Sequence, residues 1–160
     1  MRMRIAVSAL ALALVSLCAS RPAHAVFGAV GWLGMGYIFE NGDNESLGPT
    51  VEVGASFSVP LAAVDITYWN DMNNVSDFSE IRAGARLSPP IIPFYGRAAI
   101  GLPFQSDVRD VLGADVVIGA GLTALSIPLL DLNVELDYHY WTAASDFHPF
   151  EVKVGVVIGF

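Results

Sequence analysis

Apolar and polar residues alternate along most of this chain with a period of two. The pattern is clearest over 130–141, where one set of positions is apolar or aromatic and the other is mainly polar or charged. Because successive side chains of a β-strand point to opposite faces, this pattern predicts a strand with one apolar and one polar face. The same alternation predicts eight strands in all, over 26–39, 51–59, 63–69, 81–87, 94–104, 112–124, 130–141 and 150–160.

Short and long connections alternate between the predicted strands. The three short ones repeat a serine and proline pattern: Ser58-Val59-Pro60-Leu61, Ser88-Pro89-Pro90-Ile91 and Ser126-Ile127-Pro128-Leu129. Proline fits a turn or a strand end but not the interior of a paired strand, so the repeating unit is a hairpin. The other four connections are longer and polar, over 40–49, 70–80, 105–111 and 142–149. A competing interpretation is a transmembrane helix over the apolar run 112–130, which its glycines and prolines disfavour.

The N-terminus has a different pattern, which is typical of export. Arg2 and Arg4 precede a short apolar run, and Ala23-His24-Ala25 fits the small-residue cleavage site of a secretory signal peptide. We therefore predict that residues 1–25 are a cleaved signal peptide and that residues 26–160 form one domain. The alternatives are an uncleaved anchor helix, for which the apolar run is short, and a lipoprotein modified at Cys18.

The predicted mature chain is strongly acidic. Residues 26–160 contain five basic residues and all 16 acidic ones, a formal net charge of −11. This charge excludes nucleic-acid binding through the overall field of the protein. The one cysteine lies in the signal peptide, so no disulfide framework is expected. An exported chain that is 54% apolar and has no disulfides is explained if it lies in lipid.

In hydrocarbon, every backbone N–H and C=O group needs a partner, and a sheet meets that demand only by closing on itself. Bacterial outer-membrane barrels do so with an even number of antiparallel strands, short turns on the periplasmic side and longer loops outside. The predicted fold is therefore an all-β, eight-stranded antiparallel up-and-down transmembrane β-barrel. The alternative is a soluble barrel of the lipocalin kind, whose interior would be apolar.

Aromatic residues on the apolar face support the membrane interpretation. Four lie at the predicted periplasmic strand ends: Phe27, Phe57, Phe94 and Phe160. Seven lie at the outer ends: Tyr37, Phe39, Tyr68, Phe104, Tyr138, Tyr140 and Phe150. Two aromatic girdles that flank an aliphatic band are typical of transmembrane barrels.

The opposite face carries the charged residues and should line the interior of the barrel, its lumen. These residues are Glu52, Asp65, Arg82, Arg86, Arg97, Asp115, Asp131, Glu135, Asp137, Glu151 and Lys153, with His139 as a titratable neighbour. Eight strands leave room only for side chains, so the charges should pair and plug the lumen. We expect Asp65 to meet Arg86, and Glu135 or Asp137 to meet Lys153. A narrow proton or ion path is the alternative, because small inward glycines leave some room for water.

The last eight residues resemble the C-terminal signal that hands bacterial outer-membrane barrels to their assembly machinery. The matching positions are Lys153, Gly155, Ile158 and the terminal Phe160. In strand count, girdles and this signal, the whole chain resembles the small barrels of the OmpA and OmpX type from Gram-negative bacteria. The resemblance implies location in the outer membrane, with lipid, lipopolysaccharide and the assembly machinery as partners. No peptidoglycan-binding domain of the OmpA type is expected after Phe160.

The resemblance implies a structural or surface-interaction role, with a narrow channel second and a lipid A-modifying enzyme third. His139, followed twelve residues later by Glu151, is similar to the pair of the lipid A deacylases, but their serine two residues after the histidine is Trp141 here. A nucleophile must lie within hydrogen-bond reach of its base, so no enzyme activity is expected. No cofactor is expected either. The acidic loops lack a calcium-binding motif, although divalent cations could bridge them to lipopolysaccharide phosphates.

Overall fold

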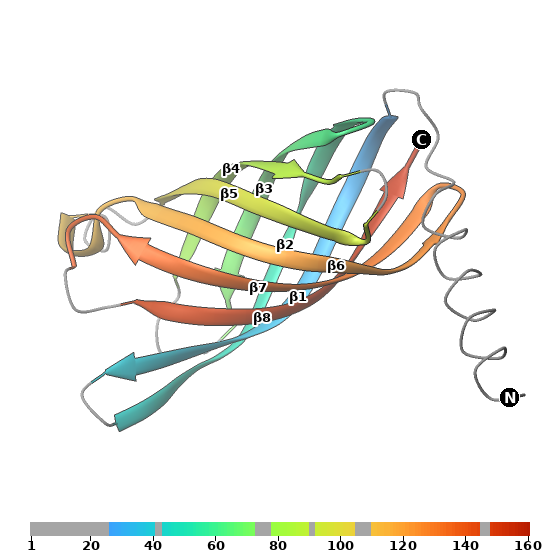
Figure 1. Cartoon of the computed structure of the whole chain (residues 1–160). Helices are drawn as coiled ribbons and strands as arrows, with labels where there is room; N and C mark the ends of the chain where they lie inside the picture. The colour runs from blue at the N-terminus through green and yellow to red at the C-terminus, as the bar shows by residue number, and fades with distance from the viewer. Residues whose placement is uncertain (1–25, 41–42, 73–77, 90–91, 105–109, 145–147) are drawn as a thin grey trace, which may run out of the picture.

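The computed structural model describes residues 26–40, 43–72, 78–89, 92–104, 110–144 and 148–160, which form a closed antiparallel barrel. Its eight strands are β1 (Val26–Glu40), β2 (Asp43–Val59), β3 (Ala62–Asp71), β4 (Ser79–Leu87), β5 (Phe94–Pro103), β6 (Asp115–Ile127), β7 (Leu130–Trp141) and β8 (Pro149–Gly159). Each strand pairs with its neighbours in the sequence, and β8 pairs with β1 (Figure 1). The predicted eight-stranded up-and-down barrel is confirmed.

Side-chain burial follows the predicted alternation. Along β5, each outward residue is exposed and each inward residue is buried, from Phe94 to Pro103. The same period holds through β3 and β8, so the apolar face of each strand points away from the axis. The lumen is therefore filled by polar, charged and aromatic side chains, as in a barrel of this strand number. A lipocalin-like apolar interior is excluded for the described residues.

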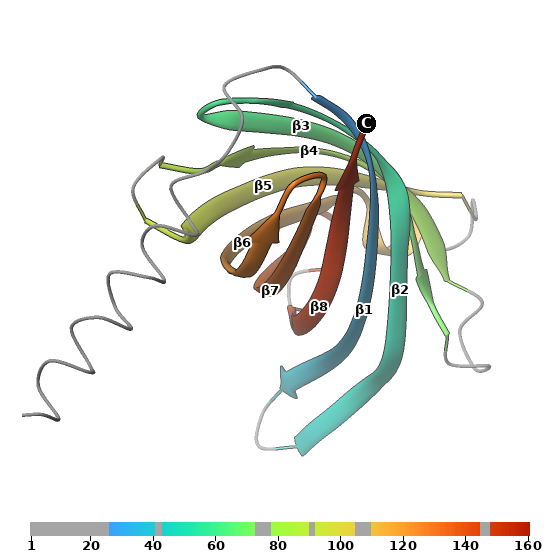
Figure 2. The same ribbon diagram turned by 90° about the vertical axis from the view of Figure 1, so that its right-hand side faces the viewer.

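The first predicted loop is mostly strand, which corrects the prediction for 40–49. β2 begins at Asp43 and pairs with β1 as far as Glu40, with a register shift between Gly36 and Tyr37. Ladder hydrogen bonds join backbone groups, so a polar sequence can extend a hairpin that is already paired. The β1–β2 hairpin projects beyond the other strands at the end opposite the C-terminus (Figure 2). We call this the long-loop end and the other the short-turn end.

The sixth strand is displaced along the chain from its predicted position, 112–124. Residues 110–112 are helical, and Gly113 has a φ of 77°, so the strand begins only at Asp115. A register shift between Thr123 and Leu125 then carries it through Ile127. This irregularity accommodates one extra residue, and Leu129, with a φ of 67°, closes the tight turn to β7. The proposed helix over 112–130 is thus wrong.

The signal peptide, residues 1–25, and the side chain of Phe39 in the outer girdle lie outside the described residues. So do parts of the predicted connections 70–80, 88–91, 105–111 and 142–149. Within the described part of the chain, no helix has the length and apolar character of a membrane span.

Candidate functional site

The centre of the lumen is organised by Glu52 on β2, whose side chain is 0% exposed. Its Oε2 accepts a hydrogen bond from Lys153 Nζ at 2.8 Å, and its Oε1 accepts one from Thr67 Oγ1 at 2.6 Å. Arg97 also pairs with Glu52, and Arg82 Nη1 lies 3.5 Å from Oε2. The Glu52 carboxylate therefore balances part of the positive charge of three buried side chains, and we call it the hub of the network.

Towards the short-turn end, two cations share two further carboxylates. Lys153 Nζ lies 2.9 Å from Glu135 Oε1 and 2.6 Å from Asp137 Oδ2. Arg97 Nη1 contacts the same two oxygens at 2.9 and 3.2 Å. Register explains the placement, because Glu135 on β7 is the direct partner of Lys153 on β8. The structure pairs both Glu135 and Asp137 with Lys153.

A small polar cavity of about 40 Å³ lies at the short-turn end. Arg86, Tyr95 and Asn133 line it, and Arg86 Nε lies 3.4 Å from Asp65 Oδ2. Asp131, assigned to the lumen from the sequence, lies at the same mouth and is only half-buried. Its Oδ1 accepts a hydrogen bond from Ser126 at 2.5 Å rather than joining the central network.

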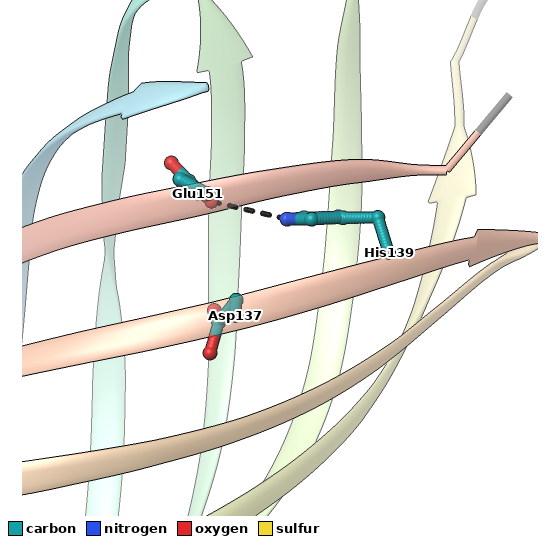
Figure 3. A group of neighbouring side chains, drawn as sticks. All are labelled: Asp137, His139 and Glu151. Carbon is teal, nitrogen blue, oxygen red and sulfur yellow. Dashed lines mark hydrogen bonds and ion pairs between the residues drawn. The ribbon is translucent and has the colours of Figure 1, made fainter. Parts of the chain in front are cut away.

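In the long-loop half, Arg82 is the central cation. It pairs with Glu80, and its Nη2 lies 3.2 Å from Asp115 Oδ2. The ring of His139 lies between two carboxylates, and its Nδ1 is 2.7 Å from Asp115 Oδ2. Its Nε2 is 3.2 Å from Glu151 Oε2 (Figure 3). Glu80 was missed because it was assigned to the loop 70–80. Extending the inward alternation by one step from Arg82 would have placed it in the lumen.

An aromatic cap, formed by Trp69, Phe78 and Trp141, covers the charged network at the long-loop end. Phe78 packs edge-on against both indoles, at centroid distances of 5.5 Å from Trp69 and 5.1 Å from Trp141. The Arg82 guanidinium lies 4.5 Å from the centre of the Trp69 ring, so the cap rests directly on the network. The sequence did not predict the cap, because Phe78 lay in a predicted loop.

Backbone hydrogen bonds fasten the chain around the aromatic cap. Thr142 N donates to Ala114 O at 3.0 Å, and Ala143 N donates to Leu112 O at 2.9 Å. Ala114 N in turn donates to Thr142 Oγ1 at 2.9 Å. Leu112 and Ala144 pack against the cap from these segments. The cap is therefore held by two connections that are 28 residues apart in sequence.

Asp137, His139 and Glu151 present ligand atoms within 4.8 Å of one another, which is a possible metal geometry (Figure 3). These oxygens already face fixed cations, since Lys153 binds Asp137 and Arg82 Nη1 lies 3.6 Å from Glu151 Oε2. A divalent ion would add charge beside these cations. The three residues are thus explained by the ion-pair network.

The geometry around His139 does not resemble a hydrolase. The ring contacts carboxylates on both sides, and Trp141, at the position of the deacylase serine, is buried in the aromatic cap. Thr50 donates a hydrogen bond to Glu151 rather than to the imidazole. The site is arranged to hold charges in place, and His139 is 3% exposed beneath the cap.

The outer face carries the aromatics assigned to the girdles, and several of them pair with one another. Phe27 lies 5.0 Å from Phe57 near the short-turn end. Towards the long-loop end, Tyr68 lies 6.1 Å from Phe104, and Tyr138 lies 5.0 Å from Phe150. The remaining described members also point outward: Tyr37, Phe94, Tyr140 and Phe160.

The residues assigned to the assembly signal lie on both faces. Lys153 points into the lumen, whereas Ile158 and Phe160 are exposed on the outside. Gly155 faces the Trp32 ring so closely that a Cβ at this position would overlap the indole. Lys153 and Gly155 thus have packing roles of their own, independent of any recognition by assembly machinery.

Comparison with known proteins gives a likeness of fold. No protein family model and no curated protein matches the sequence. Among solved structures, the crystal structure of Ail, the attachment invasion locus protein of Yersinia pestis, in complex with the heparin analogue sucrose octasulfate, superposes with a TM-score of 0.53 at 11% identity. The match covers 86% of this chain and 99% of that one. A second crystal structure of Ail gives 0.40 at the same identity and coverage.

Proposed function

We propose that this protein is an integral barrel of the bacterial outer membrane with a structural or surface-interaction role. The observation that carries the proposal is the reversal of polarity in a closed barrel, with charges inside and aliphatic side chains outside. Glu52, Arg82 and Lys153 are at most 1% exposed, while Leu33 and Ile66 are more than 60% exposed. In water this arrangement would expose apolar area and bury charge, both of which are unfavourable. In lipid the same outer face is well solvated.

The orientation we propose places the short-turn end in the periplasm and the long-loop end outside the cell. The partners are then lipid and lipopolysaccharide around the girdles, and the barrel-assembly machinery during insertion through Lys153, Gly155, Ile158 and Phe160. Likeness of fold to Ail supports a surface-interaction role, with the protruding β1–β2 hairpin as the most extended part. Ail was crystallised with a polyanion. A net charge of −11 over residues 26–160 favours a partner that is not polyanionic here.

Two measurements test the membrane assignment. The folded protein should migrate differently in gel electrophoresis before and after boiling, because a closed barrel resists detergent until heated. After fractionation of expressing cells, it should be recovered with the outer membrane. A band that does not shift, or recovery as a water-soluble protein, would refute the proposal. An external protease should cleave within the long loops of intact cells and leave the short turns uncut.

Two alternatives have their own tests. A narrow channel is favoured by the polar cavity of about 40 Å³ at the short-turn end, but the aromatic cap and the ion pairs oppose it. Planar-bilayer recordings should show no discrete conductance if the lumen is plugged. Lipid A modification is opposed by the burial of His139. Mass spectrometry of lipid A from cells with and without the protein should show the same species.

A further inference from the structure

The described part of the lumen carries more acids than bases. Eight acidic side chains are buried: Glu52, Asp65, Asp71, Glu80, Asp115, Glu135, Asp137 and Glu151. Four permanently basic side chains are buried with them: Arg82, Arg86, Arg97 and Lys153. Even with His139 as an imidazolium, three negative charges would remain. Uncompensated buried charge is strongly unfavourable, so the lumen must take up protons or other cations.

The acids differ in how well their oxygens are satisfied. Glu151 receives hydrogen bonds from Thr50, Trp69 Nε1 at 3.1 Å and His139, so it is stable as a carboxylate. In contrast, Glu80 Oε2 and Asp115 Oδ1 are fully buried and have no protein hydrogen-bond donor. A buried acceptor without a donor is unfavourable. Asp65 Oδ1, Glu135 Oε2 and Asp137 Oδ1 also lack a donor, but Glu135 and Asp137 share two cations, Arg97 and Lys153, and Asp65 faces Arg86 and Arg97. Among the described residues, Glu80 and Asp115 share one permanent cation, Arg82, which also faces Glu52 and Glu151, so positive charge is scarcest at this pair.

Glu80 and Asp115 are held together by their surroundings. A single guanidinium, that of Arg82, binds one oxygen of each, through Nε to Glu80 and through Nη2 to Asp115. Nε and Nη2 lie on the same edge of the guanidinium, so the two carboxyl groups are held side by side, each with its other oxygen left without a donor. Gly101 on β5 lies between the two strands, and a Cβ there would come within 2.5 Å of Glu80 Oε2. Glycine thus leaves the space in which the two acids meet.

We propose that Glu80 and Asp115 share one proton, which forms a carboxylic acid–carboxylate pair above Gly101. Two like charges on one edge of a single buried guanidinium cannot both remain ionised, and a shared proton supplies a hydrogen-bond donor to this pair. No bond other than the O–H bond is made or broken. The remaining groups around the pair are Arg82, His139 on β7, Glu52 on β2 and Glu151 on β8. Arg82 and His139 contact the pair, but Arg82 is also shared with Glu52 and Glu151, and His139 with Glu151. The positive charge left for Glu80 and Asp115 is therefore small, which favours a proton between them.

The shared proton also links the charged network to the aromatic cap. Phe78 precedes Glu80 by two residues, and Leu112 precedes Asp115 by three. Both pack in or against the cap. Loss of the proton would make the two carboxylates repel one another and force apart the starts of β4 and β6, and with them Phe78 and Leu112, which directly precede these strands. Protonation of the pair therefore stabilises the packing of the aromatic cap at the long-loop end.

Infrared spectroscopy of the protein purified in its folded form in detergent tests the proposal. A buried protonated carboxyl gives a carbonyl band that is absent for carboxylates and shifts in deuterated water. We expect this band at neutral pH in the native protein and its loss in both Glu80→Gln and Asp115→Asn. Glu151→Gln is the matched control, since it removes an ionised carboxylate from the same half of the lumen and should leave the band in place.

Each outcome of these measurements either supports or overturns the proposal. Absence of the band in the native protein at neutral pH overturns the proposal without any variant, even if a substitution prevents folding. A band that survives in both Glu80→Gln and Asp115→Asn, or disappears in Glu151→Gln, assigns the proton elsewhere and also overturns it. For the link to the cap, quenching of tryptophan fluorescence by acrylamide should rise at alkaline pH in the native protein but not in Glu80→Gln. An equal rise in both would refute that link.

Discussion

Lys153 Nζ on β8 lies 2.8 Å from Glu52 Oε2 on β2, although β1 separates the two strands. The side chain reaches across the Trp32 ring of β1, whose centroid is 5.2 Å from the ammonium group. Gly155 leaves the space for this indole. The contact therefore depends on β8, β1 and β2 together. It links the pairing of β1 with β8, which closes the barrel, to Glu52 at the centre of the ion-pair network.

Removal of the hub carboxylate should strongly destabilise the barrel. Glu52→Gln leaves Lys153, Arg97 and Arg82 without their shared partner, and breaking a buried ion pair from one side costs ~3–5 kcal/mol. Equilibrium unfolding in denaturant with lipid vesicles measures the change. Val53→Ala, the outward neighbour, should cost less than ~1 kcal/mol. Equal effects of the two substitutions would contradict the assigned role of Glu52.

The Asp65–Arg86 pair should show coupling in a double-mutant cycle. Arg86 Nε lies 3.4 Å from Asp65 Oδ2, and both side chains are buried near the short-turn end. Removing Asp65 takes away the acid that Arg86 pairs with, and removing Arg86 leaves Asp65 with Arg97 at 3.6 Å. Asp65→Asn with Arg86→Gln should therefore be less harmful than the sum of the single changes. The expected coupling is ~0.5–3 kcal/mol. Strict additivity of the unfolding free energies would show that the two groups act independently.

Glycines at close approaches should resist substitution, unlike glycines that face open space. At Gly155, a Cβ would overlap the Trp32 ring, so Gly155→Ala should cost ~1–3 kcal/mol in unfolding free energy. Gly31 and Gly96 have no atom within 4 Å of the Cβ position. Gly31→Ala and Gly96→Ala should be neutral or stabilising by up to ~1 kcal/mol. Destabilisation by all three would mean that loss of glycine itself matters, rather than steric overlap.

Opening the aromatic cap should weaken the long-loop end. Trp141→Ala removes a side chain that is 2% exposed and packs on Phe78, and such truncations cost ~3–5 kcal/mol. Hydrogen exchange should show faster opening at the start of β4 and at the end of β7, with slow exchange retained at the short-turn end. Ile118→Ala on the outer face is the control. A uniform increase in hydrogen-exchange rates across the barrel would indicate that the cap does not stabilise the long-loop end locally.

The terminal aromatic should affect assembly rather than stability. Phe160 is 77% exposed on the outer face, so Phe160→Ala removes few contacts within the barrel. If the C-terminal residues are read by assembly machinery, the amount of folded protein in the outer membrane should fall several-fold, while refolding in detergent stays unchanged. Phe94→Ala, at an outward position that is 59% exposed, should leave the cellular amount unchanged. An equal loss in both variants would argue against a specific signal.

The sequence by itself determined the eight strands, the direction of almost every side chain and the charged character of the lumen. It could do so because a strand has a period of two, which is a local property that is readable from consecutive residues. It located strand ends poorly, as in 40–49 and 112–114, because ladder hydrogen bonds join backbone groups whatever side chains they carry.

Only the tertiary structure decided which charges meet. Glu52 and Arg97 lie on strands separated by β3 and β4, and Arg82 on β4 pairs with Asp115 on β6 across β5. Such contacts depend on the stagger between strands once the sheet has closed, and no local pattern encodes that stagger. The aromatic cap has the same origin, since Phe78 reaches Trp141 only because the ends of β3, β4 and β7 converge around one narrow lumen.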